Sequence, residues 1–294
     1  MDFNKLRETR NKKQETRNKK QETRNKKQET RNKKSETLKL SFVADKKTLY
    51  QDIQHSISQR KKLLAILIDP EKMELQNIPG ILEKLAHTQV THVFVGGSTD
   101  KDQKTDRLLQ AIKECTHLPV IIFPGEVSQV SANADALLFL SLVSGRNPEY
   151  LIGKQIEAVS VLRTLALEII PTGYILIENG KETAVERVTQ TQPLKRSNVQ
   201  HIVDTAKAAE FLGMRCIYLE AGSGAIDPIK EEIIQAVKKD LQIPLIVGGG
   251  IRTIEQLENA YAAGADMVVI GTAMEEDATF FEELKAPLFS GHFP

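Results

Sequence analysis

The sequence places one carboxylate directly before a glycine-rich turn. Residues 216–224 read CIYLEAGSG. The first of these suit a buried strand, Glu220 ends it, and Gly222-Ser223-Gly224 can turn sharply and present backbone N–H groups to an anion. A carboxylate beside such a nest suits a general base next to a bound phosphate. A barrel strand that ends in an ordinary glycine turn would give the same local pattern, so this stretch alone leaves both interpretations open.

Glycine clusters recur at the ends of two later apolar runs, as Gly248-Gly249-Gly250 and Gly271-Thr272. Each cluster precedes a segment expected to be helical, so backbone donors and the positive end of a helix dipole could face one anion. In parallel barrels, phosphate commonly binds after strands seven and eight. We therefore predict a phosphate site here, with close packing of helices on strands as the plainer explanation of the glycines.

Asp69 and Ser98 end the first two apolar runs and offer a carboxylate and a hydroxyl to a cation. These ligands predict a magnesium site, because Mg²⁺ takes oxygen ligands and usually keeps several waters. Asp69 could instead cap a helix before Pro70, and Ser98 could be a turn residue. Tyr174 could equally line a ligand groove or pack under a loop. The six histidines lack ligand spacing, which argues against zinc.

Eight short apolar runs alternate with helical segments and would carry these residues at their carboxyl ends. The expected strands are 63–68, 91–95, 119–123, 136–140, a fifth that starts within 167–170, 216–220, 244–247 and 266–270. The expected helices are 49–62, 74–88, 102–115, 148–165, 198–212, 226–239, 253–263 and one that begins near 275. Such strands form a parallel sheet buried on both faces. Eight such strands are the number that closes a (β/α)8 barrel, so we predict an α/β fold of the TIM-barrel type. An open doubly wound sheet is the alternative.

Residues 124–135 leave little room for the helix that should follow the third strand. The segment contains glycine, has no clear amphipathic period and barely accommodates a full crossover. We therefore predict a modified barrel in which the third helix is missing or replaced by a short extended segment. The gap would leave an apolar groove on the flank of the barrel.

Charge is distributed unevenly along the 294 residues. Residues 1–37 hold 14 Lys and Arg against 6 Asp and Glu, a net charge of +8; because the whole chain carries +1, the remainder carries −7. The repeat RNKKQET has a period of seven but no apolar residue for a coiled-coil seam. We predict a disordered basic tail, residues 1–38, before a barrel domain, residues 39–294. The alternative for the tail is an arm that touches an anionic membrane or RNA.

The mildly acidic barrel gives no reason to expect nucleic acid as a partner. Cys115 and Cys216 both lie beside expected strands and suit small buried residues in a reducing cytosol. The chain opens without a secretory signal, and its apolar runs are shorter than the ~18 residues of a membrane span. We therefore expect a cytoplasmic protein with, at most, transient contact with a membrane surface.

Five segments together resemble one enzyme family: LLAILIDPEK, THVFVGGST, PTGYILIENGKETAVERV, YLEAGSGA and LIVGGGIRT. In content and order they are similar to segments of the geranylgeranylglyceryl phosphate synthase family, from about residue 49 to the last helix. The resemblance implies a modified barrel without its third helix. It also implies that a polyprenyl diphosphate is joined to the 3-hydroxyl of sn-glycerol 1-phosphate, with Mg²⁺ as cofactor, by a homo-oligomer that is a dimer or a hexamer.

Matching motifs imply roles for single residues. By resemblance, Asp69 and Ser98 would hold Mg²⁺, Glu220 would be the catalytic base, and Tyr174 is the second candidate catalytic residue. The residues expected to hold glycerol phosphate are Tyr218, Leu219, Glu220, Ala221, Gly222, Ser223, Gly224, Gly249, Gly250, Gly271 and Thr272. Family members often carry Asn at the position of Thr272. We expect little effect, because that part of the site uses backbone donors.

Alternatives remain for the donor and for the reaction. The segment YILIENGKETAVERV resembles that of family members that use a C20 geranylgeranyl donor. A C35 heptaprenyl donor is the alternative. The candidate wall or floor residues of the groove, which would set the donor length, are Phe123, Leu138 and Leu140. An isomerase or synthase barrel of amino-acid biosynthesis would share the phosphate loops. An isomerase of this kind would use a pair of aspartates, one on strand one and one on strand five. The expected fifth strand ends without a carboxylate, which argues against isomerisation. A catalytically dead phosphoglycerol-binding barrel is disfavoured by the intact metal and base residues.

Removing residues 1–37 should leave the fold and the activity in detergent-free assays unchanged, because the repeat offers no apolar surface to bury. Thermal unfolding and turnover of the truncated and full-length proteins check this expectation. A large fall in melting temperature after truncation would show that the tail packs.

Overall fold

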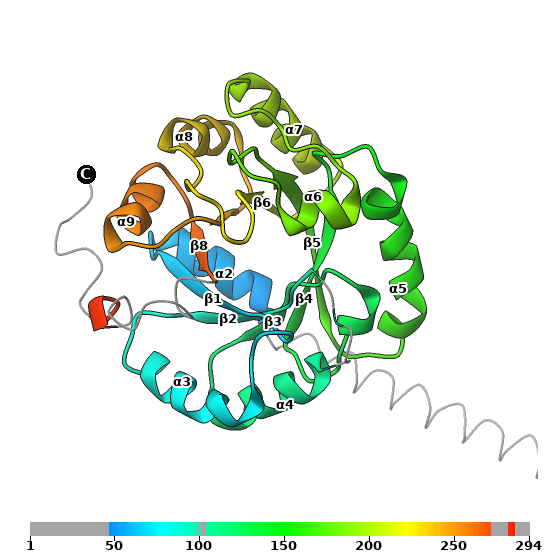
Figure 1. Ribbon diagram of the computed structural model, residues 1–294, viewed down its shortest axis with the longest axis vertical. Coiled ribbons are helices and arrows are strands. Elements are labelled where there is room, and N and C mark those ends of the chain that lie inside the picture. Colours follow the sequence, from blue (N-terminus) through cyan, green and yellow to red (C-terminus); the bar gives the residue numbers. More distant parts are fainter. Residues whose placement is uncertain (1–46, 99, 101–103, 272–281, 286–294) are drawn as a thin grey trace, which may run out of the picture. The chain divides into compact units, whose positions relative to one another are not determined.

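The computed structural model describes residues 47–98, 100, 104–271 and 282–285. Its strands pair in chain order, and β1 also pairs with β8, so the parallel sheet closes into a barrel (Figure 1). The strands are β1 (Leu63–Ile68), β2 (His92–Val95), β3 (Val120–Ile122), β4 (Ala136–Leu142), β5 (Glu168–Leu176), β6 (Cys216–Glu220), β7 (Leu245–Gly248) and β8 (Met267–Ile270). The predicted barrel is confirmed. The predicted tail and the start of the last predicted helix lie outside the described residues.

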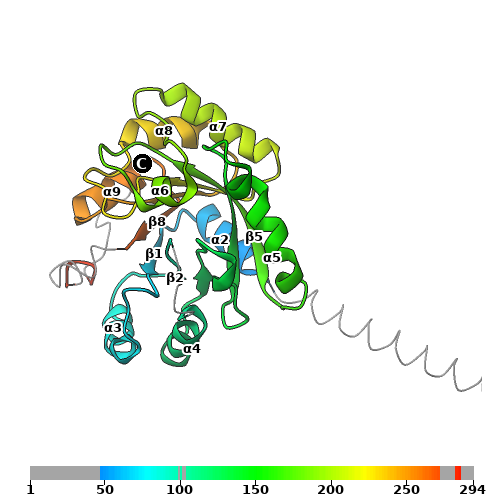
Figure 2. The ribbon, with the colours of Figure 1, turned by 45° about the vertical axis from the view of Figure 1, so that its right-hand side comes forward.

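Helices surround the barrel on its outside (Figure 2). They are α3 (Ile78–Leu85), α4 (Thr105–Cys115), α5 (Lys154–Leu162), α6 (Ala184–Thr189), α7 (Val199–Phe211), α8 (Glu231–Asp240) and α9 (Ile254–Ala262). Short turns precede or replace some of them: η1 (Leu75–Asn77), η2 (Val127–Gln129) and the π-helical turn η3 (Glu149–Gly153). The exception is α2 (Leu49–Ser58), which packs Tyr50 and Ile53 against the residues inside the barrel.

Strand alternation separates two apolar layers. On β1, Leu63 and Ala65 belong to the layer inside the barrel, whereas Leu64 and Ile66 belong to the layer between strands and helices. Side chains alternate between the two faces of a strand with a period of two. The same alternation continues just beyond the carboxyl ends of the strands. Asp69, two residues after the inward-facing Leu67, is therefore expected to face inward as well. The pattern therefore determines which residues can enter a site at the mouth of the barrel.

A carboxylate at the start of β5 fixes α2 in place. Glu168 accepts hydrogen bonds from the backbone N–H groups of Leu49 (2.6 Å) and Tyr50 (3.1 Å). These N–H groups open the helix and have no partner within it, so the carboxylate caps them and favourably meets the helix dipole. The Tyr50 hydroxyl donates to the Arg215 carbonyl at 2.9 Å. Helix α2 is thereby attached to the starts of β5 and β6, at the end of the barrel where the strands begin.

The third helix is missing, as predicted. Between β3 and β4 the chain forms only the single turn η2. The Glu126 and Gln129 side chains cap this turn reciprocally. Glu126 also forms an ion pair of 3.1 Å with Lys154 of α5, so the loop is joined to the next helix along the chain.

Three predictions of local structure were wrong. The helix expected from residue 226 begins only at Glu231, because Ile229 is buried and Lys230 is still extended, so residues 221–230 form a long loop. Tyr174 lies within β5 rather than after it. Cys115 ends α4 and is exposed, whereas Cys216 is buried as expected. Helices of the described residues are too short or too polar to cross a membrane.

Candidate active site

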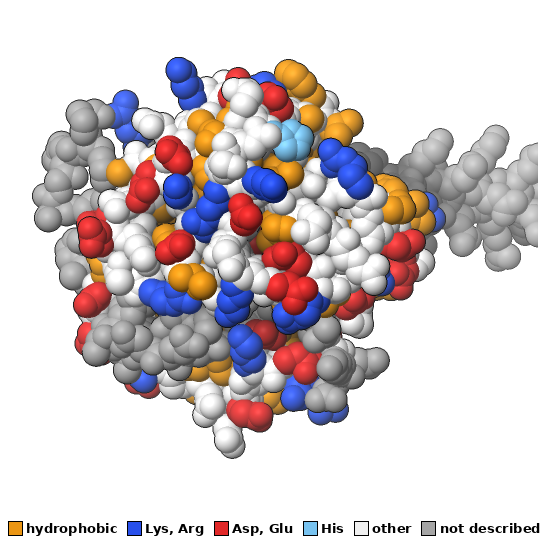
Figure 3. Space-filling model, turned by 45° about the horizontal axis from the view of Figure 1, so that its top comes forward, with side chains coloured by type: hydrophobic (Ala, Val, Ile, Leu, Met, Phe, Trp, Pro, Cys, Tyr) orange, Lys and Arg blue, Asp and Glu red, His pale blue; other side chains and the backbone are white. Residues whose placement is uncertain are grey.

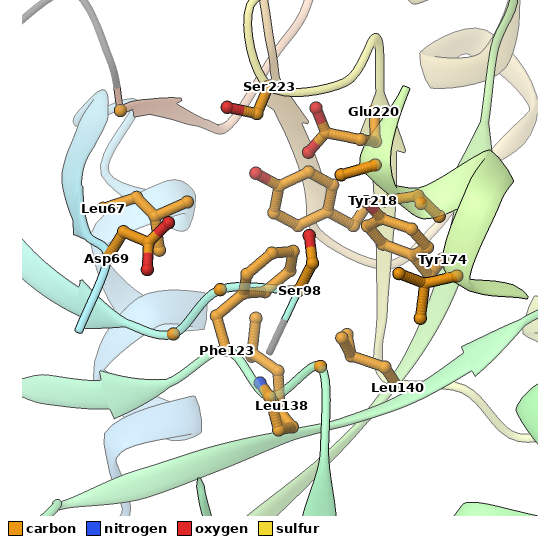
Figure 4. Close-up of a pocket in the computed structure, with 18 of the residues that line it drawn as sticks. Leu67, Asp69, Ser98, Phe123, Leu138, Leu140, Tyr174, Tyr218, Glu220 and Ser223 are labelled. Atoms are coloured by element: carbon orange, nitrogen blue, oxygen red, sulfur yellow. The ribbon is translucent and has the colours of Figure 1, made fainter. Parts of the chain in front are cut away.

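One pocket of about 320 Å³ extends from the mouth of the barrel toward the gap left by the missing helix. Its polar end is formed by residues that follow β1, β2, β6, β7 and β8. Its apolar end is formed by β4, the loop after β3, α5 and α6. Figure 4 shows labelled residues of both ends around the same space. The predicted phosphate side, metal side and flank groove thus belong to one pocket.

Glu220 ends β6 and points inward at the mouth. Its side chain is only 6% exposed, and its Oε1 accepts a hydrogen bond of 2.6 Å from the backbone N–H of Gly222. The carboxylate therefore lies directly against the turn that was predicted to hold phosphate. The candidate base and the glycine turn are therefore in direct contact.

The environment of Glu220 sets its proton affinity. Burial raises the pKa of the Glu220 carboxyl to about 7, although hydrogen bonds from the Gly222 N–H and from the Tyr218 and Tyr174 hydroxyls lower it. Burial, followed by the negative charge of Glu220, raises the pKa of both tyrosines well above the usual value. The tyrosines therefore stay protonated and can only donate to the carboxylate. A carboxyl with this pKa exchanges its proton near neutral pH, which suits a general base.

Aromatic rings support the two hydroxyls. Phe123, which follows β3, stacks on Tyr218 with ring centroids 5.0 Å apart, and its centroid lies 5.8 Å from that of Tyr174. The Tyr174 and Tyr218 rings are 5.5 Å apart. Contacts of this kind add to the apolar burial of each ring. Tyr174 lines the pocket, as one of the two earlier interpretations expected, and Phe123 lies beside the candidate base.

The turn after β6 and the turn after β7 meet around the carboxylate. Gly222 (φ +101°) and Gly249 (φ +86°) both adopt left-handed backbone, which strains other residues. A Cβ atom at Gly249 would lie 2.5 Å from Oε1 of Glu220. Successive N–H groups in such turns form concave sites for anions. Gly222 and Gly249 thus allow the sharp turns of the candidate anion site, and Gly249 also leaves room for the Glu220 carboxylate.

Other predicted phosphate residues fall into three groups. Ser223, Gly224, Gly250 and Gly271 line the pocket with Tyr218 and Glu220. Leu219 and Ala221 are fully buried in the layer between strands and helices and do not line it. Thr272 lies outside the described residues.

Asp69 and Ser98 lie at the polar end, and Asp69 is across the pocket from Glu220 in Figure 4. Asp69 Oδ1 accepts from the backbone N–H of Glu71 at 3.0 Å, so the residue also caps a turn. Its Oδ2 lies 4.0 Å from Lys72 Nζ. A Cβ atom at Gly97 would lie 2.6 Å from Asp69 Oδ1, so this glycine makes room for the carboxylate.

The apolar end runs along β4. Leu138 and Leu140 line it, as does Phe139 from the opposite face of the strand. Val127 of η2 and Val185 of α6 also contribute. The apolar end of the pocket therefore reaches from the inner face of β4, with Leu138 and Leu140, to its outer face, with Phe139, beside the loop that replaces the third helix. The structure thus has the apolar groove that was predicted at this gap.

Several structural features around the pocket were not recognised from the sequence. Helix α6 was missed, although Thr183 and Glu186 form a capping box with the sequence signature T-x-x-E. Asn179 is 4% exposed, and its amide donates to the Ala221 carbonyl. Gly248 admits the Tyr218 hydroxyl, since a Cβ atom there would collide with it. Only the capping box had a local signal; the other two contacts join segments far apart in the sequence.

The chain is similar to known proteins over most of its length. Residues 55–287 match the PcrB family. A geranylgeranylglyceryl phosphate synthase of Zunongwangia profunda is 54% identical over 215 residues, 73% of this chain and 92% of that protein. One of Flavobacterium johnsoniae is 50% identical over 235 residues, 80% of this chain and 97% of that protein.

A solved structure is also similar. The crystal structure of (S)-3-O-geranylgeranylglyceryl phosphate synthase from Thermoplasma acidophilum, in complex with its substrate sn-glycerol-1-phosphate, superposes with a TM-score of 0.76. It is 37% identical and covers 81% of this chain and 96% of its own. The resemblance predicted from five sequence segments is thereby confirmed, and the chain belongs to the PcrB family.

Proposed function

We propose that this protein is a geranylgeranylglyceryl phosphate synthase, a prenyltransferase that joins geranylgeranyl diphosphate to the 3-hydroxyl of sn-glycerol 1-phosphate. One observation carries the proposal: the buried carboxylate of Glu220 lies between a glycine nest and an apolar groove. Such a site suits an acceptor with phosphate at one end and a hydroxyl at the other, beside a donor that is mostly hydrocarbon. Curated relatives bear the same name over most of the chain.

The reaction needs one proton acceptor. Glu220 takes the proton of the glycerol 3-hydroxyl while that oxygen bonds to the first carbon of the prenyl chain. The bond between this carbon and the diphosphate oxygen breaks, and its electron pair leaves with diphosphate. The Tyr174 and Tyr218 hydroxyls donate to the carboxylate and hold its orientation toward the acceptor.

The groove provides binding energy for the donor. Its apolar walls include Leu138, Leu140 and Val185. Each buried CH₂ group contributes roughly 0.8 kcal/mol, so a tail that fits along the flank binds far better than one left in water. Phe123 packs on Tyr218 next to the base, so we infer that it contacts the first isoprene units rather than the end of the tail.

Asp69 and Ser98 fit a Mg²⁺ ion that is shared with substrate. The described residues contain no cluster of three acidic, His or Cys side chains. Asp69 keeps one oxygen, Oδ2, directed toward Lys72 rather than to a backbone donor. Mg²⁺ is commonly bound by one or two carboxylates together with substrate phosphates and water. When bound, the ion would neutralise charge that develops on the departing diphosphate.

Location and assembly remain proposals. We propose a cytoplasmic enzyme that assembles as a homo-oligomer, a dimer or a hexamer, and contacts membranes transiently to exchange its lipid substrate and product. The helix α5 and the turn before it expose Ile156 (66%) and Ile152 (56%). Residues four apart lie on the same face of a helix, and paired apolar side chains of this kind favour a partner surface.

Purified protein incubated with labelled sn-glycerol 1-phosphate and C20 or C35 prenyl diphosphates, with and without Mg²⁺, tests the function directly. We expect a prenyl ether product, dependence on Mg²⁺, and a higher kcat/KM for the C20 donor. A clear preference for C35 means a deeper groove. The absence of any ether product with both donors would favour the isomerase or the inactive barrel.

Glu220→Gln should lower turnover on the order of 10²–10⁴-fold, the range for one general base, while glycerol phosphate still binds. The pKa of about 7 places the wild-type rise in kcat/KM near neutral pH, because the base form predominates above that pKa. A pH profile of turnover and calorimetric binding of the acceptor provide both readouts. Turnover of the variant close to wild type would exclude Glu220 as the base.

Tyr174→Phe is the matched control for this assignment. It removes one hydrogen bond that lowers the pKa of Glu220 while keeping the ring. The acid limb of the profile should therefore move to higher pH, with activity retained above it. An unmoved limb would mean that another group titrates.

Asp69→Asn should lower the Mg²⁺-dependent activity more than Ser98→Ala does, since a charged oxygen contributes more to holding a hard cation. Titration of activity with Mg²⁺ at saturating substrates compares the two variants. Wild-type titration curves for both would place the metal elsewhere in the pocket.

A further inference from the structure

The phosphate end of the pocket needs positive charge. A phosphate monoester carries about two negative charges at neutral pH, and backbone N–H groups supply only partial positive charge. Among the described residues, three cations line the pocket: Lys72 lies 4.0 Å from Asp69, Lys154 lies 3.1 Å from Glu126, and Arg252 has no such acidic partner. Figure 3 shows Lys and Arg interspersed with Asp and Glu over one face rather than gathered in a basic patch. Cationic side chains beside the nest would supply the charge that the backbone N–H groups do not.

Two cations contact the same loop. The phosphate loop, residues 222–227, follows β6 and contains the glycine nest. Lys181 Nζ donates to the Gly224 carbonyl at 3.3 Å, and Arg252 Nη1 donates to the Ile226 carbonyl at 3.3 Å. Within the part of the chain that the structure describes, neither side chain forms an ion pair at 4 Å or less.

We propose that Lys181 and Arg252 bind the acceptor's phosphate and make the site selective for phosphorylated acceptors. The inference rests on the proposed function and deepens it. In the structure, each cation hydrogen-bonds a carbonyl of the phosphate loop. When a phosphate enters the nest, each exchanges this carbonyl for a phosphate oxygen.

The length and exposure of the hydrogen bonds favour this exchange. Both are longer than the usual 2.9–3.0 Å for such bonds and lie at the surface. A cation also gains more from a charged phosphate oxygen than from a neutral carbonyl, because the attraction between opposite charges adds to the hydrogen bond. Arg252 also lines the pocket itself, and its backbone N–H donates to Gln256 of α9 at 2.8 Å.

A buried amide holds Lys181 near the nest. Asn179 donates to the Ala221 carbonyl, and its Oδ1 accepts from the backbone N–H of Lys181 at 3.1 Å. Thr183 packs against the bare side of Gly222. The loop after β5 is thus fixed against the phosphate loop on both sides of Lys181, which leaves the ammonium beside Gly224.

A third cation at this loop has a different role. Arg196 donates to the Glu178 carbonyl through Nε and to the Asp227 carbonyl at 2.9 Å through Nη2. It therefore bridges two loops with two bonds. We assign Arg196 to holding the loops together and not to the ligand.

The test measures phosphate binding apart from prenyl transfer. Lys181→Met, Arg252→Met and the double variant are titrated calorimetrically with inorganic phosphate and with sn-glycerol 1-phosphate, and are assayed for KM and kcat. Since a hydrogen bond to a charged group contributes about 1.5–3 kcal/mol, each single change should raise Kd for phosphate about tenfold or more. KM for the acceptor should rise in parallel, with kcat changed less than about twofold. Lys181→Arg should restore most of the affinity.

The matched control is Lys230→Met, because Lys230 lies just beyond the same loop and pairs with Glu232 at 3.7 Å. It should leave both constants at wild-type values. Unchanged phosphate affinity in the double variant would overturn the inference, as would an equal loss in Lys181→Arg and Lys181→Met. If wild-type protein binds phosphate through these cations but makes no ether product, the proposed function fails and the inference stands. If it makes the product and the double variant binds phosphate normally, only the inference fails.

Discussion

Burial of the Glu220 carboxylate is the constraint from which most of the site follows. An ionised carboxyl that is 6% exposed loses its hydration, at a cost of several kcal/mol unless partners replace the water. One backbone N–H and two tyrosine hydroxyls replace part of the lost hydration. Burial therefore raises the pKa of Glu220 only to about 7. The balance keeps both protonation states accessible near neutral pH, which a base must have. The turn that donates the N–H also forms the nest, so base and anion site cannot be separated.

The missing helix has an energetic consequence as well as a steric one. Strands of a parallel barrel need cover on their outer face. At β4, the outward side chain of Phe139 is only half-buried and lines the groove, whereas Leu137 on the same face is fully buried. The loop with η2 and the neighbouring α5 cover Phe139 only in part. A hydrocarbon chain lying in the groove would complete the cover, so the substrate takes the place of an element that the fold lacks.

Sequence patterns predicted the barrel well because eight apolar runs and their glycine ends are local signals. They also predicted that Asp69, Ser98 and Glu220 lie at or just after the carboxyl ends of strands, and the structure brings all three to the wall of one pocket. Tyr174 remained ambiguous because its strand was expected to be shorter than it is. The contact of Asn179 with the Ala221 carbonyl could not be predicted, because it depends on how two loops meet. The late start of α8 was missed because Asp-Pro imitates a helix start.

The two ends of the barrel are coupled through β5. Glu168 begins this strand and caps α2, and Tyr174, an inward position six residues later, donates to Glu220. At about 3.3 Å per residue, the strand spans roughly 20 Å between them. Helix α2 packs Tyr50 and Ile53 against the same inner layer that contains Tyr174 and Tyr218. The dry interior that raises the pKa of Glu220 therefore extends to the helix that closes the opposite opening, and a loosened α2 would admit water beneath the two tyrosines and lower that pKa.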